Sequence, residues 1–176
     1  MRIIAGKLGG RQFDSPRGNR THPMSDRVRG ALFNTLGDIT GLTVLDAFAG
    51  SGALSFEAVS RGATHSIAID RDKNAIRALR ENVRQLDVGD SVKPIQANSS
   101  GWSDLNPDKL FDIVILAPPY DSLQEAVLEK LARHTKPGGI LIIDWPGKVS
   151  GPRFNGFELV THKDYGDAAL FFFRPI

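Results

Sequence analysis

The segment 46–53 constrains the fold of this chain more than any other part of its sequence. It reads Asp-Ala-Phe-Ala-Gly-Ser-Gly-Ala, it follows an apolar strand predicted over residues 43–46, and a helical pattern over 51–61 follows it. From residue 42 onward, strand and helix patterns alternate, which is typical of βαβ units with parallel strands. The sequence therefore predicts an α/β fold with a mostly parallel sheet. The glycine loop should lie outside the carboxyl end of a strand, where such folds bind ligands.

The other elements follow from the same patterns. We predict strands over 66–70, 91–95, 111–116 and 140–144, and helices over 72–86 and 122–133. Asp121 is expected to cap the start of the last helix, and Pro137-Gly138-Gly139 to end it. Two strands at 156–163 and 168–174 are joined by a turn around Gly166, and a connection this short requires them to be antiparallel.

The N-terminal part of the chain differs from the rest in its charge. Residues 1–24 are predicted to form a short hairpin and a loop, after which Ser25 or Asp26 caps a helix that runs to about Leu36. We therefore divide the chain into an N-terminal extension, residues 1–37, and a main domain, residues 38–176. Residues 1–34 hold seven Arg or Lys against two Asp. Such an arm suits a polyanion, although a solvated basic loop would have the same composition.

Length and composition favour one ordinary soluble domain. The chain has 176 residues, 41% of them hydrophobic, and no apolar run reaches the roughly 20 residues needed to span a membrane. It has no cysteine, which excludes disulfides, thiol catalysis and cysteine-ligated zinc. The four histidines lack metal-ligand spacing, so we predict no metal site and expect all four at the surface or in turns. These features lead us to expect a cytoplasmic protein.

Two classes of cofactor compete for the glycine loop. A dinucleotide site requires Gly-x-Gly-x-x-Gly, but the third position here is Ser55. Asp46 would repel a pyrophosphate, whereas it suits the cationic amino group of the methyl donor S-adenosylmethionine. Asp70 ends the next strand, 18 residues after Gly52, where an acid can bind ribose hydroxyls. The pattern favours the methyl donor, and the alternative for Asp46 is that it accepts hydrogen bonds from the amides of its own loop.

A second distinctive loop, Ala117-Pro118-Pro119-Tyr120, follows the apolar strand 111–116. It resembles the Asp- or Asn-Pro-Pro-Tyr loop of amino-methyltransferases. The resemblance implies that two acceptors, the first side chain and the first proline's carbonyl, take the hydrogens of an exocyclic base amine while the aromatic ring stacks on the base. Ala117 removes the side-chain acceptor, and the carbonyl of Pro118 remains. The alternative is a rigid turn with a buried tyrosine.

Further motifs are distributed over nearly the whole chain. They are Met-Arg-Ile-Ile-Ala-Gly at 1–6, Ser-Asp-Arg-Val-Arg at 25–29, Ala-Leu-Phe-Asn at 31–34, Leu-Asp-Ala-Phe-Ala-Gly-Ser-Gly-Ala-Leu at 45–54, Ser-Arg-Gly-Ala at 60–63, Phe-Asp at 111–112 and Tyr-Gly-Asp at 165–167. Together they resemble the bacterial small-subunit rRNA guanine-N2 methyltransferase family of the RsmD type. The resemblance implies a Rossmann-like class I methyltransferase fold and S-adenosylmethionine as cofactor. It also implies small-subunit rRNA, or the assembling small ribosomal subunit, as partner, and we expect a monomer.

The resemblance assigns roles to individual residues. Those expected to hold the methyl donor are Asp46, Phe48, Ala49, Gly50, Ser51, Gly52, Asp70, Arg71, Asn98 and Ser99. Those expected at the reacting amine are Ala117, Pro118, Pro119 and Tyr120. Those expected to contact RNA are Arg2, Lys7, Arg11, Arg20, Arg27 and Arg29.

Four positions depart from the family's pattern. Ala117 replaces an acid, His22-Pro23-Met24 replaces Arg-Pro-Thr, Arg29-Gly30 replaces Arg-Glu, and Asn98 replaces an acid near the adenine. The first three cluster on the substrate side, and they leave open a non-catalytic RNA-binding or ribosome-assembly factor that retains the fold. A DNA adenine methyltransferase shares the Pro-Pro-Tyr chemistry, but no separate DNA-recognition domain is present in the sequence.

Overall fold

The computed structural model describes residues 1–18 and 23–176, and it contains every helix and strand predicted after residue 24 together with one more helix. Ser25 caps the first helix as predicted, because its side chain accepts a hydrogen bond from the Val28 amide. The predicted N-terminal hairpin is a single antiparallel bridge between Arg2 and Gln12. In chain order, the elements are α1 (Asp26–Leu36), β1 (Thr43–Asp46), α2 (Ala53–Ser60), β2 (His65–Asp70), α3 (Lys73–Leu86), β3 (Val92–Gln96), α4 (Ser99–Leu105), β4 (Phe111–Leu116), α5 (Glu125–Ala132), β5 (Thr135–Pro146), β6 (Phe157–Asp164) and β7 (Ala168–Pro175).

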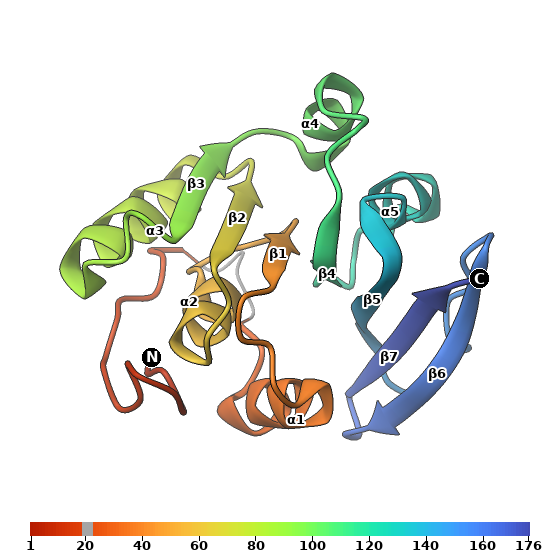
Figure 1. The fold of residues 1–176 in the computed structure, drawn as a ribbon, viewed down its shortest axis with the longest axis horizontal. Helices are drawn as coiled ribbons and strands as arrows, with labels where there is room; N and C mark the ends of the chain where they lie inside the picture. The colour runs from red at the N-terminus through yellow and green to blue at the C-terminus, as the bar shows by residue number, and fades with distance from the viewer. Residues whose placement is uncertain (19–22) are drawn as a thin grey trace.

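These strands form a seven-stranded sheet in the order β3-β2-β1-β4-β5-β7-β6 (Figure 1). Strands β1 to β5 are parallel, and β7 is antiparallel to both of its neighbours, β5 and β6. The chain runs from β1 outward to β2 and β3 and then returns to β4 on the other side of β1. The boundary between β1 and β4 is therefore the topological switch point, the place where open α/β sheets bind ligands.

Helices cover both faces of the sheet, and each face has its own apolar cluster. On one face, α1, α2 and α3 contribute Leu32, Phe33, Phe56 and Leu79, which pack with Ile113, Ile115 and Ile142 of the sheet. On the other face, α4 and α5 contribute Trp102, Leu128 and Leu131, which pack with Val114, Leu141 and Ile143. Successive residues of β4 and β5 alternate between the two clusters because side chains of a strand point to opposite faces.

The predicted boundaries around α5 and β5 are wrong. Helix α5 begins at Glu125, because the Ser122 amide donates to the carbonyl of Pro119 in a turn that delays the helix, and Asp121 does not cap it. Pro137-Gly138-Gly139 lies inside β5, which begins at Thr135 and has an irregular register opposite β4. A side chain at Gly139 would meet the carbonyl oxygen of Asp112 at 2.7 Å, so this glycine allows the two backbones to approach.

Helix α4 is the element that we did not predict. It has seven residues and includes a glycine, so no apolar stripe is visible in its sequence. Asn98 caps it by accepting hydrogen bonds from the amides of Ser100 (2.9 Å) and Gly101 (3.2 Å), and Trp102 anchors it in the core.

The N-terminal segment is attached to α2 through a buried carboxylate, Glu57. Its oxygens accept hydrogen bonds from the amides of Ile4 (2.8 Å) and Ala5 (3.1 Å). Two arginines flank this carboxylate: Arg61 donates at 2.8 Å, and Arg29 lies at 3.5 Å. Ile3 and Phe13 are buried in the same apolar cluster as α2, so the segment shares the core of the sheet domain.

His134 lies in a turn, which is one of the two kinds of position predicted for the histidines, but the turn is buried. His134 is only 2% exposed, its Nε2 lies 2.7 Å from the Ser103 hydroxyl, and its ring packs against Trp102. A surface or turn position was expected; the turn is confirmed, and the burial could not be predicted because its partners come from distant parts of the sequence. Within residues 1–18 and 23–176, no helix is long and apolar enough to cross a bilayer.

Candidate functional site

The glycine loop and the Pro-Pro-Tyr loop meet at the switch point. The first follows β1, the second follows β4, and these two strands are direct neighbours in the sheet. Backbone hydrogen bonds extend the contact beyond the strands, since the Ala47 amide donates to the Ile115 carbonyl (3.3 Å) and the Ala49 amide to the Ile69 carbonyl (2.8 Å). Ser99, at the start of α4, donates its hydroxyl to the Ala47 carbonyl at 2.5 Å.

Asp70 holds the glycine loop in shape. One of its oxygens accepts a hydrogen bond from the Gly50 amide (2.9 Å) and the other from the Asp72 amide (2.9 Å). Gly50 and Gly52 both have a positive φ, which favours glycine, and a side chain at Gly52 would meet Leu79 at 2.3 Å. Contact with loop amides was the alternative that we gave for Asp46, and in the structure Asp70 makes it. Each carboxylate oxygen of Asp70 can still accept a further bond.

Asp46 lies fully buried beneath the loop. Its Oδ2 accepts a hydrogen bond from the Ser55 hydroxyl (2.7 Å), which in turn accepts one from Ser66 (2.8 Å). Its Oδ1 has no hydrogen-bond partner among the residues that the structure describes. Burial, together with the nearby charge of Asp70, raises the pKa of Asp46 to about 7. A buried carboxylate with one free oxygen, next to a second acid, is suited to a cationic group.

The other residues predicted to hold the donor surround these two acids. Phe48, Ala49 and Ser51 lie in the glycine loop itself, Arg71 follows β2 with an exposed side chain, and Ser99 is buried against Ala47. The amide oxygen of Asn98 is already bonded to the first turn of α4. We had expected that oxygen to accept a hydrogen bond from an adenine amine, and it would have to do so in addition to its capping bonds.

At the second loop, Tyr120 makes a contact that we did not predict. Its ring is partly exposed, and its hydroxyl donates to Oδ1 of Asp144 on β5 at 2.5 Å. Burial and this neighbouring carboxylate raise the pKa of Tyr120, and burial raises the pKa of Asp144 to about 6. Pro118 is buried, Pro119 is exposed, and Ala117 packs against the cluster under α1 to α3. The tyrosine is therefore not the core residue of a plain turn.

Two residues that sequence reasoning missed connect the site to the rest of the fold. Asp144 follows an apolar run in β5, but no local pattern indicates a partner for its carboxylate. Asn82 lies at helical spacing with Leu79 and Leu86, which could have marked it as buried. Its side chain binds the backbone of Asp14 and donates to the Ser51 carbonyl at 3.3 Å, so it joins the N-terminal segment to the glycine loop.

The structure separates the predicted RNA-contacting cations into groups. Arg29 is a correction: its side chain is 0% exposed and donates to the Arg2 carbonyl at 2.6 Å, so it cannot reach a phosphate. Arg20 lies outside the described residues. Arg2 pairs with Asp26 (3.2 Å), and Arg27 lies over the Tyr165 ring at 5.4 Å, so both are at the start of α1.

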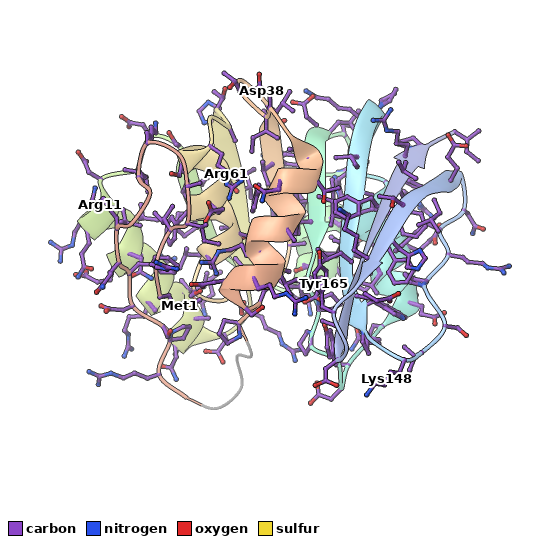
Figure 2. The ribbon with its side chains drawn as sticks, turned by 90° about the horizontal axis from the view of Figure 1, so that it is seen from below. Met1, Arg11, Asp38, Arg61, Lys148 and Tyr165 are labelled. Atoms are coloured by element: carbon purple, nitrogen blue, oxygen red, sulfur yellow. The ribbon has the colours of Figure 1, made fainter. Side chains whose placement is uncertain are left out.

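Lys7 and Arg11 lie on the side of the sheet where the parallel strands begin, whereas the two loops lie where these strands end. The Lys7 amide donates to the carbonyl of Ser60, the last residue of α2, and Arg11 donates to the carbonyl of Gln85 near the end of α3. Because α2 and α3 begin at the carboxyl ends of β1 and β2, their last residues lie at the far edge. In Figure 2, Tyr165 lies beside the end of the α1 ribbon that is farther from Asp38, whereas Arg61 and Asp38 lie towards the opposite side of the view.

Comparisons with known proteins agree with this architecture. The family model described as "Conserved hypothetical protein 95" matches residues 1–174. "Putative rRNA methyltransferase YlbH" of Bacillus subtilis (strain 168) is 31% identical over 173 residues, which cover 94% of each chain. "Ribosomal RNA small subunit methyltransferase D" of Haemophilus influenzae is 33% identical over 150 residues, or 82% of this chain and 78% of that protein.

A solved structure has the same fold. The Escherichia coli structure described as "Putative methyltransferase yhhF" superposes with a TM-score of 0.86 at 28% identity, and the match covers 99% of this chain and 97% of that one. The seven-stranded sheet, the loops at its switch point and this superposition confirm the Rossmann-like class I methyltransferase fold. The match over residues 1–174 and the named relatives show that the chain belongs to the RsmD-type family.

Proposed function

We propose that this protein transfers a methyl group from S-adenosylmethionine to the exocyclic N2 amine of a guanine in small-subunit rRNA. The observation that carries the proposal is the pairing of two loops at one switch point. One covers a buried carboxylate with an oxygen that has no hydrogen-bond partner in residues 1–18 and 23–176, and the other presents Pro-Pro-Tyr from the neighbouring strand. The names of the relatives support an rRNA methyltransferase, and the methyl donor and the guanine amine are our inference from the site.

The residues around the glycine loop fit the proposed donor. Asp46 Oδ1 would accept from a cationic amino group, and Gly50 and Gly52 would allow the close approach of a ligand. Asp70 would accept from ribose hydroxyls while keeping its bond to the Gly50 amide. When bound, S-adenosylmethionine supplies an electrophilic methyl group, and the chemistry needs no metal.

On the substrate side, Pro118 and Tyr120 would position the base. The Pro118 carbonyl would accept one hydrogen of the amine, and the partly exposed ring of Tyr120 would stack on the guanine. Such a base must be unpaired or extruded from its stack to enter the site. A stack of this kind fixes the plane of the base and therefore the direction of the amine.

The direct test is transfer of radiolabelled methyl to undermodified small ribosomal subunits. The native protein is compared with Ala117→Asp, and the position of the label is then mapped to a nucleotide. We expect label from the native protein at the N2 of one guanine. A native protein that binds the donor and transfers nothing, to subunits or to free rRNA, would overturn the proposal.

A second candidate function rests on Ala117. An apolar side chain at this position lacks the acceptor of the related loops, and loss of a preorganised group at a reacting centre can lower a rate about 10²- to 10³-fold. A non-catalytic RNA-binding or assembly factor would bind the donor and the subunit without turnover. Label that appears with Ala117→Asp but not with the native protein would support this second function.

Replacing Asp70 with alanine is expected to weaken binding of the methyl donor at least tenfold, because the variant loses both the ribose acceptor and the bond that shapes the loop. Isothermal titration calorimetry measures the affinity. Asp72→Ala is the matched control, since Asp72 only caps α3. Equal affinity of the Asp70 variant and the native protein would remove Asp70 from the donor site.

We also propose that residues 1–37 form the part that contacts RNA, through the cations at the start of α1. The double variant Arg2→Ala/Arg27→Ala should weaken RNA binding. The logarithm of the binding constant should also fall less steeply with the logarithm of the salt concentration, with a slope smaller in magnitude by about 2. The control is Lys7→Ala/Arg11→Ala, which removes two cations at the far edge of the sheet. If both double variants bind RNA equally well, the start of α1 is not the contact.

A further inference from the structure

Ala117, which stands where the related loops have an acid, lies beside β5, and β5 carries an acid, Asp144. In the parallel pair of β4 and β5, Leu116 is level with Ile143, and continuing this register by one residue brings Ala117, the first residue after β4, next to Asp144. Adjacent parallel strands are about 4.8 Å apart, and residues in register point to the same face. For this pair it is the face of Ile115 and Ile142, which is covered by α1 to α3. A carboxylate is therefore present one strand away from the place where the loop lacks one.

Asp144 is already turned towards the Pro-Pro-Tyr loop. Its Oδ1 accepts a hydrogen bond from the hydroxyl of Tyr120 at 2.5 Å, across the gap between β5 and the loop after β4. Within the described parts of the chain, no other side chain or amide donates to this carboxylate. Oδ2 is thus left with an open acceptor position, and the side chain is partly shielded from water.

We propose that Asp144 supplies the acceptor for the target amine that Ala117 cannot supply, with Tyr120 holding the carboxylate in place. The inference rests on the proposed function, since it assigns the second acceptor of that same site. The Pro118 carbonyl would take one amine hydrogen and Asp144 Oδ2 the other. The same tyrosine would then orient the base through its ring and the acid through its hydroxyl.

In this proposal the Asp144 carboxylate also removes a proton from the methylated amine. The lone pair of the amine nitrogen forms the new N–C bond, and the electron pair of the donor's S–C bond stays on sulfur. The methylated nitrogen then carries one proton too many, and that proton passes to Asp144 Oδ2. The resulting carboxylic acid releases the proton to solvent, so the enzyme returns to its starting state.

The proposal is tested by moving the carboxylate from position 144 to position 117. Asp144→Ala should lower kcat for methyl transfer about 10²- to 10³-fold with little change in KM. Ala117→Asp in the same background should restore at least a tenth of the native kcat, because it returns a carboxylate to the site from the neighbouring strand. Asp144→Asn keeps an oxygen acceptor for Tyr120 but cannot take a proton, and it should lose at least tenfold.

The absorbance of the Tyr120 phenolate as a function of pH tests the contact between Tyr120 and Asp144 in the absence of methyl donor and RNA. The chain has two tyrosines, so Tyr165→Phe leaves the phenol of Tyr120 as the one tyrosine signal. Burial and Asp144 raise the pKa of Tyr120, and Asp144→Ala should therefore bring its phenolate absorbance to lower pH. An unchanged titration would show that the two groups do not interact in solution and would overturn the proposal.

The outcomes separate this inference from the proposed function. If the native protein transfers methyl and a folded Asp144→Ala variant matches it, the assignment of Asp144 is wrong and the proposed function stands. If Asp144→Ala is inactive but Ala117→Asp does not rescue it, Asp144 only supports the loop, and the acceptor role is again wrong. If the native protein transfers no methyl, both proposals fail. Asp144→Asn provides the same comparison if the alanine variant does not fold.

Discussion

Replacing Glu57 with alanine is expected to lower the free energy of unfolding by about 3–5 kcal/mol. The carboxylate is buried, and it accepts the amides of Ile4 and Ala5 while it lies between Arg29 and Arg61. Its removal leaves the fully buried guanidinium of Arg29 with Asp26 as its one remaining acidic neighbour in the described residues. Thermal unfolding followed by circular dichroism measures the loss, which should exceed about 6 °C for a chain of this size.

The matched control for this variant is Glu81→Ala. Glu81 forms an exposed pair with Arg84 on α3, and such pairs contribute little to stability because water screens both charges. Hydrogen exchange supplies a local readout, because the amides of Ile4 and Ala5 should lose protection in the Glu57 variant and keep it in the control. Equal stability of the two variants would mean that the N-terminal segment is held by apolar packing alone.

Asp46→Asn is expected to have opposite effects on stability and on donor binding. The pKa of Asp46 is raised to about 7 in the folded protein from 3.8, so the folded state binds its proton more tightly than the unfolded chain does. The ionised carboxylate therefore lowers stability increasingly as the pH rises from about 4 to 7. Asparagine carries no charge, and it should raise the unfolding free energy by about 1–3 kcal/mol at pH 8 but not at pH 4.

The same Asp46→Asn substitution should weaken donor binding roughly 10- to 100-fold, since a hydrogen bond to a charged group is worth about 1.5–3 kcal/mol. Unfolding curves at the two pH values and calorimetric titration with S-adenosylmethionine measure the two effects. Ser55→Ala is the comparison, because it removes the hydroxyl bound to Asp46 and leaves the carboxylate in place, so it should lower stability at pH 8. An asparagine variant that binds the donor normally would rule out Asp46 as its partner.

Periodicity predicted the sheet well because each strand of the parallel core is a short apolar run between clear breaks. It predicted β4 to the residue, and it predicted the antiparallel end from the length of one turn. Periodicity failed at Gly139, because a glycine can either end a helix or allow two backbones to approach closely, and both leave the same local pattern. Gly139 reads as a helix terminator in sequence, but its role depends on the Asp112 carbonyl of a neighbouring strand, which no local pattern contains.

The site was predictable where its residues are adjacent in sequence and not where partners come from distant segments. The two loops and their acids follow directly from the strands that they end. The roles of Asp46 and Asp70 depend on which acid faces the loop amides, and only the fold decides that. The burial of Arg29 depends on Glu57, 28 residues away, so a basic motif that suggested RNA contact belongs to the interior.

The position of β7 between β5 and β6 has a consequence for synthesis on the ribosome. Residues 168–175 are made after the other strands of the sheet, yet they pair with residues 141–146 of β5, the strand that carries Asp144. Until they emerge, β5 has a free edge with Leu141, Ile142 and Ile143 beside unpaired backbone groups, a surface that invites pairing with other chains. The strand that carries Asp144 therefore gains its second neighbour in the sheet only when these late residues have been made.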